Sequence, residues 1–162
     1  MSTTESTTES TTESTTASIA EINRLLDRLT ETWNAGDSAG YAGLFTEDAD
    51  YITFFGLHLQ GREAIEETHR GLFRTAIKLG ESRAEPHIRF LTDDVAVVVS
   101  LGTSSVAGVP DPSRDSVVTL TALRTPGGWR FAAFQNSRVQ NLQSQGQGQG
   151  EGQGQGLGSA ER

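Results

Sequence analysis

The sequence predicts an α+β fold with a curved antiparallel sheet and helices on one of its faces. Apolar side chains recur at helical spacing in the first half of the chain, and apolar or alternating segments separated by turn residues fill the second half. Both ends are low in complexity, with Ser-Thr-Thr-Glu repeats at 2–13 and alternating glycine at 145–158. We therefore predict disordered tails at 1–17 and 141–162 around one domain at 18–140.

Composition narrows the classes of function. The formal net charge is −8, and no block of Lys or Arg occurs, so neither nucleic acid nor an anionic membrane is expected as a partner. The chain has no cysteine, which excludes disulfides and thiol chemistry. We expect no secretory signal and no transmembrane helix, because no apolar stretch approaches about 18 residues. The expected location is the cytoplasm.

Three helices are predicted. The first begins at Ser18, where Glu21 completes a capping box, and ends before Gly36. A short second helix begins at Asp37 or Ser38, and a third covers Arg62–Leu79.

The predicted strands are separated by turn residues, among which Thr46–Asp48 is read as an acidic turn. The strands are expected at 50–54, 57–60, 83–91, 95–106, 115–124 and 129–139.

Four segments resemble those of the nuclear transport factor 2-like superfamily. They are WNAGD at 33–37, LFTEDADY at 44–51, GREAI at 61–65 and GGWRFAAFQNSRV at 127–139. The AAFQN segment is most similar to SgcJ/EcaC-type (SnoaL-like) proteins. The resemblance implies a cone-shaped barrel, a homodimer formed through the sheet, and a pocket between the long helix and the concave sheet. It also implies an apolar ligand, such as a polyketide-like or aromatic intermediate of secondary metabolism.

The superfamily includes isomerases, dehydratases, cyclases and non-catalytic association modules, so the resemblance does not define a reaction. In the isomerases that it resembles, the catalytic aspartate falls on Thr53 and the oxyanion-hole tyrosine on Leu29. Neither residue can take over that role, so ketosteroid isomerisation is not expected. The sequence lacks a dinucleotide-binding glycine pattern and metal-ligand spacing of histidines, so we expect no cofactor and no metal.

His69 is the candidate catalytic residue. It lies four residues after Ile65 and four before Phe73, which places it on the inner face or at the edge of the third helix. There it could act as a general acid or base near pH 7. The alternative is a core histidine that is hydrogen-bonded to a neighbour.

The predicted pocket residues are aromatic or can form hydrogen bonds. They are Trp33, Tyr51, Thr53, Phe73, Phe90, Asn136 and Arg138. Strand alternation admits either Tyr51 and Thr53 or Ile52 and Phe54 to the interior, and the first pair is preferred because Thr53 takes the base position. Arg138 is expected either to bind a carboxylate or to form a surface salt bridge. The rings of Trp33, Phe73 and Phe90 are expected to pack in the core first and to line the pocket second.

Together these observations predict a small pocket protein that binds a hydrophobic intermediate. If it is an enzyme, it isomerises, dehydrates or cyclises its substrate by acid–base chemistry without a cofactor. The alternative is a non-catalytic dimerisation module or ligand-binding accessory module.

Overall fold

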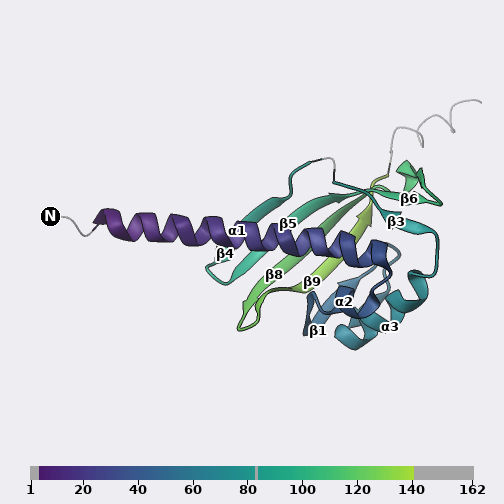
Figure 1. Cartoon of the computed structure of the whole chain (residues 1–162), viewed down its shortest axis with the longest axis horizontal. Helices are drawn as coiled ribbons and strands as arrows, with labels where there is room; N and C mark the ends of the chain where they lie inside the picture. The colour runs from purple at the N-terminus through teal and green to yellow at the C-terminus, as the bar shows by residue number, and fades with distance from the viewer. Residues whose placement is uncertain (1–3, 83, 141–162) are drawn as a thin grey trace, which may run out of the picture.

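The computed structural model describes residues 4–82 and 84–140. The helices are α1 (Thr4–Ala35), α2 (Ser38–Ala42), α3 (Arg62–Leu72) and the short 3₁₀ helix η1 (Pro112–Arg114). The strands are β1 (Phe45–Ile52), β2 (His58–Gln60), β3 (Ile77–Leu79), β4 (His87–Thr92), β5 (Val95–Gly102), β6 (Ser104–Val106), β7 (Val109–Pro110), β8 (Ser116–Thr125) and β9 (Gly128–Arg138). In Figure 1, α1 lies across one face of the sheet, and α2 and α3 lie near the C-terminal end of α1.

The main sheet has six strands in the order β2-β1-β9-β8-β5-β4, and β3-β6-β7 form a smaller sheet. The predicted α+β class is confirmed, but the sheet is mixed rather than wholly antiparallel. The last strand, β9, returns beside the first, β1, and runs parallel to it, whereas the other neighbouring strands are antiparallel. None of the helices in the described ranges combines the length and apolar character needed to cross a bilayer.

Helix α1 begins much earlier than predicted. It starts at Thr4 and runs through most of the segment expected to be a disordered tail. Ser18 therefore lies inside the helix instead of capping it, and its hydroxyl donates to Ser14 O at 2.8 Å. Once the packed turns from Ile22 onward exist, each added residue gains one hydrogen bond without a new nucleation cost. The predicted C-terminal tail, 141–162, lies outside the described residues.

The predicted acidic turn at Thr46–Asp48 is part of β1. The pairing register between β1 and β9 shifts between Phe45, opposite Phe131, and Asp50, opposite Ala133. This irregularity lets β1 carry the exposed Glu47 and Asp48 while Phe45 and Ala49 stay buried. The acidic residues that indicated a turn are instead the exposed residues of this strand.

The predicted helix at 62–79 is interrupted. Helix α3 ends at Leu72, and β3 follows at Ile77–Leu79. Helix α1 stabilises β3 directly, because Trp33 Nε1 donates to Ile77 O at 3.1 Å and Asn34 Nδ2 donates to Leu79 O at 2.9 Å. Leu79 N in turn donates to Asn34 Oδ1 at 2.9 Å, so tertiary hydrogen bonds override the helical pattern.

The core lies between α1, α2, α3 and the inner face of the main sheet. Its largest fully buried side chains are Tyr41, Phe45, Phe131, Ile22, Leu44, Ile65, Leu120 and Val98. Two backbone hydrogen bonds connect its layers: Phe131 N donates to Leu44 O at 2.9 Å, and Gly61 N donates to Ala49 O at 2.8 Å.

Gly61 is predicted to tolerate alanine poorly. It precedes α3 with φ 84° and ψ 158°, and an added Cβ would lie 3.1 Å from Glu47 O. Gly61→Ala should lower the free energy of unfolding by about 1–3 kcal/mol in urea denaturation. The control is Gly71→Ala on the same helix, where a Cβ meets no atom within 4 Å. That control should raise stability by up to about 1 kcal/mol. Equal urea midpoints for Gly61→Ala and wild type would contradict the prediction.

Candidate functional site

A cavity of about 1220 Å³ lies between α1, α3 and the inner face of the sheet. Its apolar wall includes Leu26 and Leu29 from α1, Val118 and Leu120 from β8, and Phe134 from β9. The cavity volume is somewhat larger than the usual range for small-molecule sites, which is about 300–1,000 Å³. Such sites are mostly apolar and contain a few precisely placed polar groups.

A cluster of aromatic rings forms the α3 side of this cavity. The His69 ring lies 4.6 Å from the Tyr41 ring, 5.0 Å from Tyr51 and 5.6 Å from Trp33, between centroids. Phe73 contacts the same cluster at 5.6 Å from His69. The rings come from α1, α2, β1 and the end of α3, so the cluster joins four elements.

A chain of hydrogen bonds runs through these rings. His69 Nδ1 lies 2.7 Å from Ile65 O, and a carbonyl oxygen can only accept, so Nδ1 carries the proton. In a neutral ring Nε2 is then the acceptor, and the Tyr51 hydroxyl donates to it at 3.2 Å. The Tyr41 hydroxyl donates in turn to Tyr51 Oη at 3.0 Å.

Burial determines the protonation states of this chain. It lowers the pKa of His69 from 6.5 to about 4, and the hydrogen bond to Ile65 O offsets only part of that shift. Burial also raises the pKa of both Tyr41 and Tyr51 above its ordinary value. At neutral pH, therefore, all three groups are uncharged. The neutral His69 is thus not a general acid at neutral pH, although Nε2 remains a base of about carboxylate strength.

Polar side chains collect along the ends of β1 and β9. Thr53, Asn136 and Arg138 all line the cavity. The parallel pairing of Tyr51 with Phe134 sets β1 beside β9, and these two rings stack with centroids 4.1 Å apart. Asn136 Oδ1 is buried and has no hydrogen-bond partner among the described residues.

Six of the eight residues singled out from the sequence line the cavity. They are Trp33, Tyr51, Thr53, His69, Asn136 and Arg138. Of the two exceptions, Phe73 packs against Trp33 at 5.0 Å between centroids but does not line the cavity.

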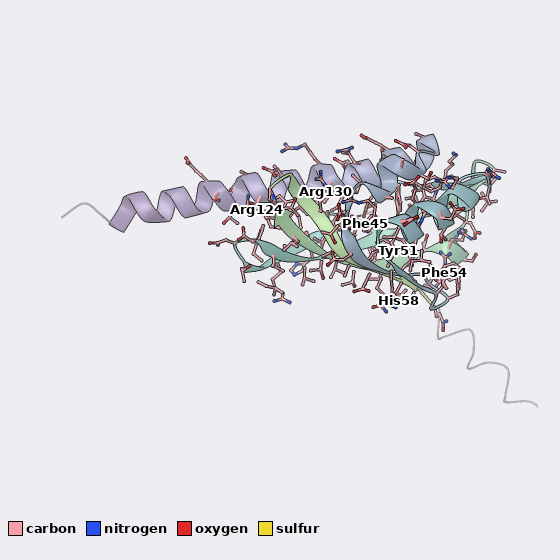
Figure 2. All side chains as sticks on the ribbon, turned by 90° about the horizontal axis from the view of Figure 1, so that it is seen from below. Phe45, Tyr51, Phe54, His58, Arg124 and Arg130 are labelled. Carbon is pink, nitrogen blue, oxygen red and sulfur yellow. The ribbon has the colours of Figure 1, made fainter. Side chains whose placement is uncertain are left out.

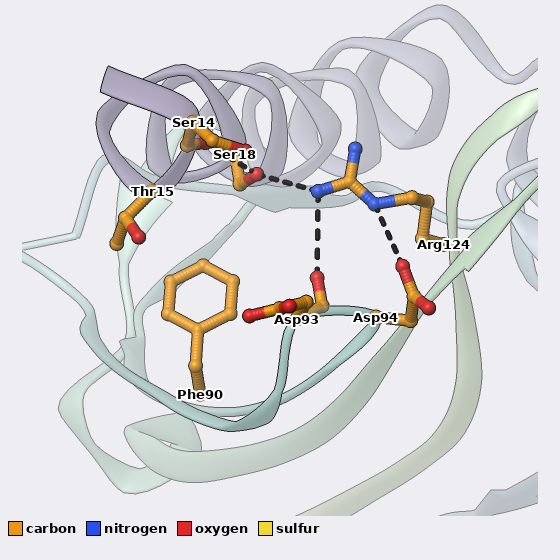
Figure 3. Close-up of a pocket in the computed structure, with 7 residues that line it drawn as sticks. All are labelled: Ser14, Thr15, Ser18, Phe90, Asp93, Asp94 and Arg124. Carbon is orange, nitrogen blue, oxygen red and sulfur yellow. Dashed lines mark hydrogen bonds and ion pairs between the residues drawn. The ribbon is translucent and has the colours of Figure 1, made fainter. Parts of the chain in front are cut away.

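Phe90 lies in a different place. It lines a second, polar pocket of about 390 Å³ between α1 and the β4–β5 turn (Figure 3). There Arg124 donates from Nη2 to Ser18 Oγ at 2.8 Å and pairs from Nε with Asp94 Oδ1 at 3.0 Å. Ser14 and Thr15 of the unexpected extension of α1 line this pocket, so no sequence pattern placed Phe90 in it.

The structure matches neither of the two alternatives for β1 completely. Tyr51 and Thr53 line the cavity, and so does Phe54, whereas Ile52 does not. Strand β1 ends at Ile52, so alternation no longer decides where Phe54 points. The Thr53 hydroxyl accepts from Leu57 N at 3.0 Å and helps to close the β1–β2 turn.

His58 lies apart from the cluster, whereas His87 lines the cavity from β4. His58 Nε2 lies 2.7 Å from Asp50 Oδ1, and both side chains are largely exposed. In Figure 2, His58 lies with Phe54 near one end of the sheet, whereas Arg124 and Arg130 lie toward the other. No group of three or more potential metal ligands occurs within the described ranges.

Many residues of the cavity wall were not singled out from the sequence, and Tyr41 and Arg114 are two of them. A buried tyrosine usually needs a hydroxyl partner, so Tyr41 in the predicted second helix would have suggested a polar contact. Arg114 lines the cavity from η1, in a segment for which neither a helix nor a strand was predicted. No local pattern indicated that its side chain would turn inward.

Comparison with known proteins defines the family. A family model for the SnoaL-like domain matches residues 22–140. The chain belongs to the SnoaL-like domain family. The predicted resemblance to the nuclear transport factor 2-like superfamily is thus confirmed, whereas the match does not separate the SgcJ/EcaC-type group from its relatives. Curated proteins give no match to this SnoaL-like chain.

Two solved structures illustrate the similarity. A domain of unknown function with a cystatin-like fold from Nostoc punctiforme is 29% identical, with a TM-score of 0.73 over 80% of this chain and 82% of that one. An NTF2-like protein with a cystatin-like fold from Novosphingobium aromaticivorans is 24% identical, with a TM-score of 0.70 over 86% of this chain and 92% of that one. The latter likeness concerns the fold alone.

The lowered pKa of His69 predicts a pH-dependent stability. Below pH 6.5 the unfolded chain takes up a proton at this residue, whereas the folded chain does so only near pH 4. The stabilisation is thus fully present above about pH 6.5 and is lost as the pH falls through 4. Between these values the wild type should lose about 3 kcal/mol more than His69→Gln, measured by urea denaturation across pH. Parallel curves for the two proteins would show that His69 is not held neutral.

Proposed function

We propose that this SnoaL-like domain binds an apolar small molecule in the large cavity. The observation that carries the proposal is the cavity itself, about 1220 Å³ and lined by side chains such as Leu26, Val118 and Phe134. An empty space of this size would forfeit dispersion contacts along its wall, and an apolar ligand would restore them. A flat aromatic or polyketide-like intermediate of secondary metabolism fits the aromatic lining on the α3 side.

The second candidate is acid–base catalysis in the same cavity. The hydrogen-bonded chain that ends at His69 Nε2 favours it, because Tyr51 and His69 both line the cavity. A ligand carbonyl that accepts from the Tyr51 hydroxyl would free Nε2 to remove an acidic C–H proton. That reaction would be a cofactor-independent isomerisation, dehydration or cyclisation. The first candidate ranks higher, because in the unliganded chain Nε2 is already occupied as an acceptor.

We also propose that the domain forms a homodimer through the outer face of the sheet. Partly exposed apolar side chains lie there, opposite the buried Ala96 and Val98 of β5. They include Val97 and Val99, and such a face is a candidate for burial against a second copy.

Native mass spectrometry of the protein purified from its own host tests binding and assembly together. We expect a dimer that carries a co-purified apolar compound. A dimer without a bound compound, together with no thermal shift from aromatic or polyketide-like compounds, would instead favour a non-catalytic association module.

A cavity-filling variant tests where the ligand lies. Val118→Trp projects a large ring into the cavity and should weaken binding of the co-purified compound by about tenfold or more, measured by titration calorimetry. The control is Thr119→Trp, at an exposed position on the opposite face of the same strand. It should leave affinity unchanged. Equal loss in both variants would place the binding site elsewhere.

A further inference from the structure

Two arginines from separate elements line the cavity. Arg138 ends β9, and Arg114 ends η1. Arg138 Nη1 donates to the backbone oxygen of Arg114, which ties the two residues together. The Arg138 guanidinium also lies over the Phe54 ring, 3.9 Å from its centroid, and Arg114 Nε donates to Ser104 Oγ at 3.2 Å. These contacts orient both guanidiniums.

The two side chains together carry two positive charges. Among the side chains that the structure describes, none forms an ion pair with either guanidinium. The carboxylate of Asp111 favours the charged form of Arg138, and its Oδ1 also accepts from Ser113 N at 3.1 Å. Burial first, and then the Arg114 charge, lower the pKa of Arg138, which shows that the two cations repel each other in a partly desolvated place.

The residues beside Arg138 are also suited to a polar ligand group. Asn136, whose buried Oδ1 lacks a partner within the described residues, lies two positions earlier on the same face of β9. Ser116 lies opposite Arg138 in the strand register and also lines the cavity. The acidic residues of the cavity wall come from other elements: α1 and the segment between β3 and β4. They are Asp27, Glu31, Glu81 and Glu85.

We propose that Arg114 and Arg138 form a subsite for the acid group of an otherwise apolar ligand. This proposal rests on the proposed function, because the apolar part of the ligand would occupy the same cavity. The planar forks of two guanidiniums match the oxygen atoms of a carboxylate or sulfonate, and charge-assisted hydrogen bonds of this kind are the strong ones. The anion would neutralise both charges, and the hydrocarbon part would extend along Val118 and Phe134. The preferred ligand is therefore an apolar acid, not a neutral hydrocarbon.

A pair of fluorescent dyes separates the acid group from the apolar part. Anilinonaphthalene sulfonate carries an anionic group, and N-phenylnaphthylamine has the same ring system without it. Both gain fluorescence in an apolar environment, so titration gives an affinity for each. We expect the wild type to prefer the sulfonate dye by about tenfold.

Charge-removing variants test the subsite. Arg138→Gln and Arg114→Gln should each weaken sulfonate binding by about tenfold and change binding of the neutral dye by less than about twofold. Arg138→Lys keeps the charge and should restore part of the preference. The control is Arg130→Gln, also on β9 but outside the cavity wall, which should bind both dyes as wild type does. If Arg138→Gln does not fold, as judged by circular dichroism, Arg114→Gln decides the question.

The possible outcomes separate the two proposals. Equal affinity for the two dyes, unchanged in the arginine variants, overturns the acid subsite and leaves the apolar cavity intact. Loss of the sulfonate preference in Arg130→Gln as well would show a general charge effect and also overturns the subsite. Failure of both dyes to bind overturns the proposed function and the subsite with it.

Discussion

The hydrogen-bonded chain from Tyr41 through Tyr51 to His69 connects a helix pair to the sheet beside the cavity. Its members come from α2, β1 and α3, and all three side chains are almost completely buried. A buried polar group without a partner costs up to several kcal/mol. In this chain, only one arrangement of the hydroxyl and ring protons gives each of them an acceptor. The chain therefore fixes α3 against β1, while burial keeps His69 neutral. It also places three hydrogen-bonding side chains on the wall of the cavity.

The parallel contact between β1 and β9 gives the cavity its second side. It brings the first and last strands of the domain together, with Tyr51 opposite Phe134. Asn136 and Arg138 then continue along β9 beyond the stacked rings. Along β9 the wall of the cavity thus changes from the aromatic Phe134 to the polar Asn136 and the cationic Arg138. An apolar ligand with an acid group would match this sequence of surfaces.

The family and the site contribute different parts of the functional conclusion. Membership of the SnoaL-like family establishes the architecture, in which a sheet and helices can enclose a pocket, but folds of this kind do not define a reaction. The proposals therefore depend on the residues of this chain. The neutral His69, already engaged by Tyr51, favours binding over catalysis. The proposed subsite at Arg114 and Arg138 would add a charge preference that the family match does not contain.

Periodic and local signals were enough to predict the α+β class, the helical pattern of Ile22 to Trp33 and most strands of the second half. They reduced the cap of the second helix to Asp37 or Ser38, and the structure shows Asp37. The sequence also identified six residues that line the cavity. The tertiary structure alone decided where α3 ends, since Trp33 and Asn34 bind β3 across 44 and 45 residues of chain. It also decided the bulge in β1, the separate pocket of Phe90 and the inward position of Arg114. Those features arise from contacts between distant segments, and a local pattern of side chains does not record which segments will meet.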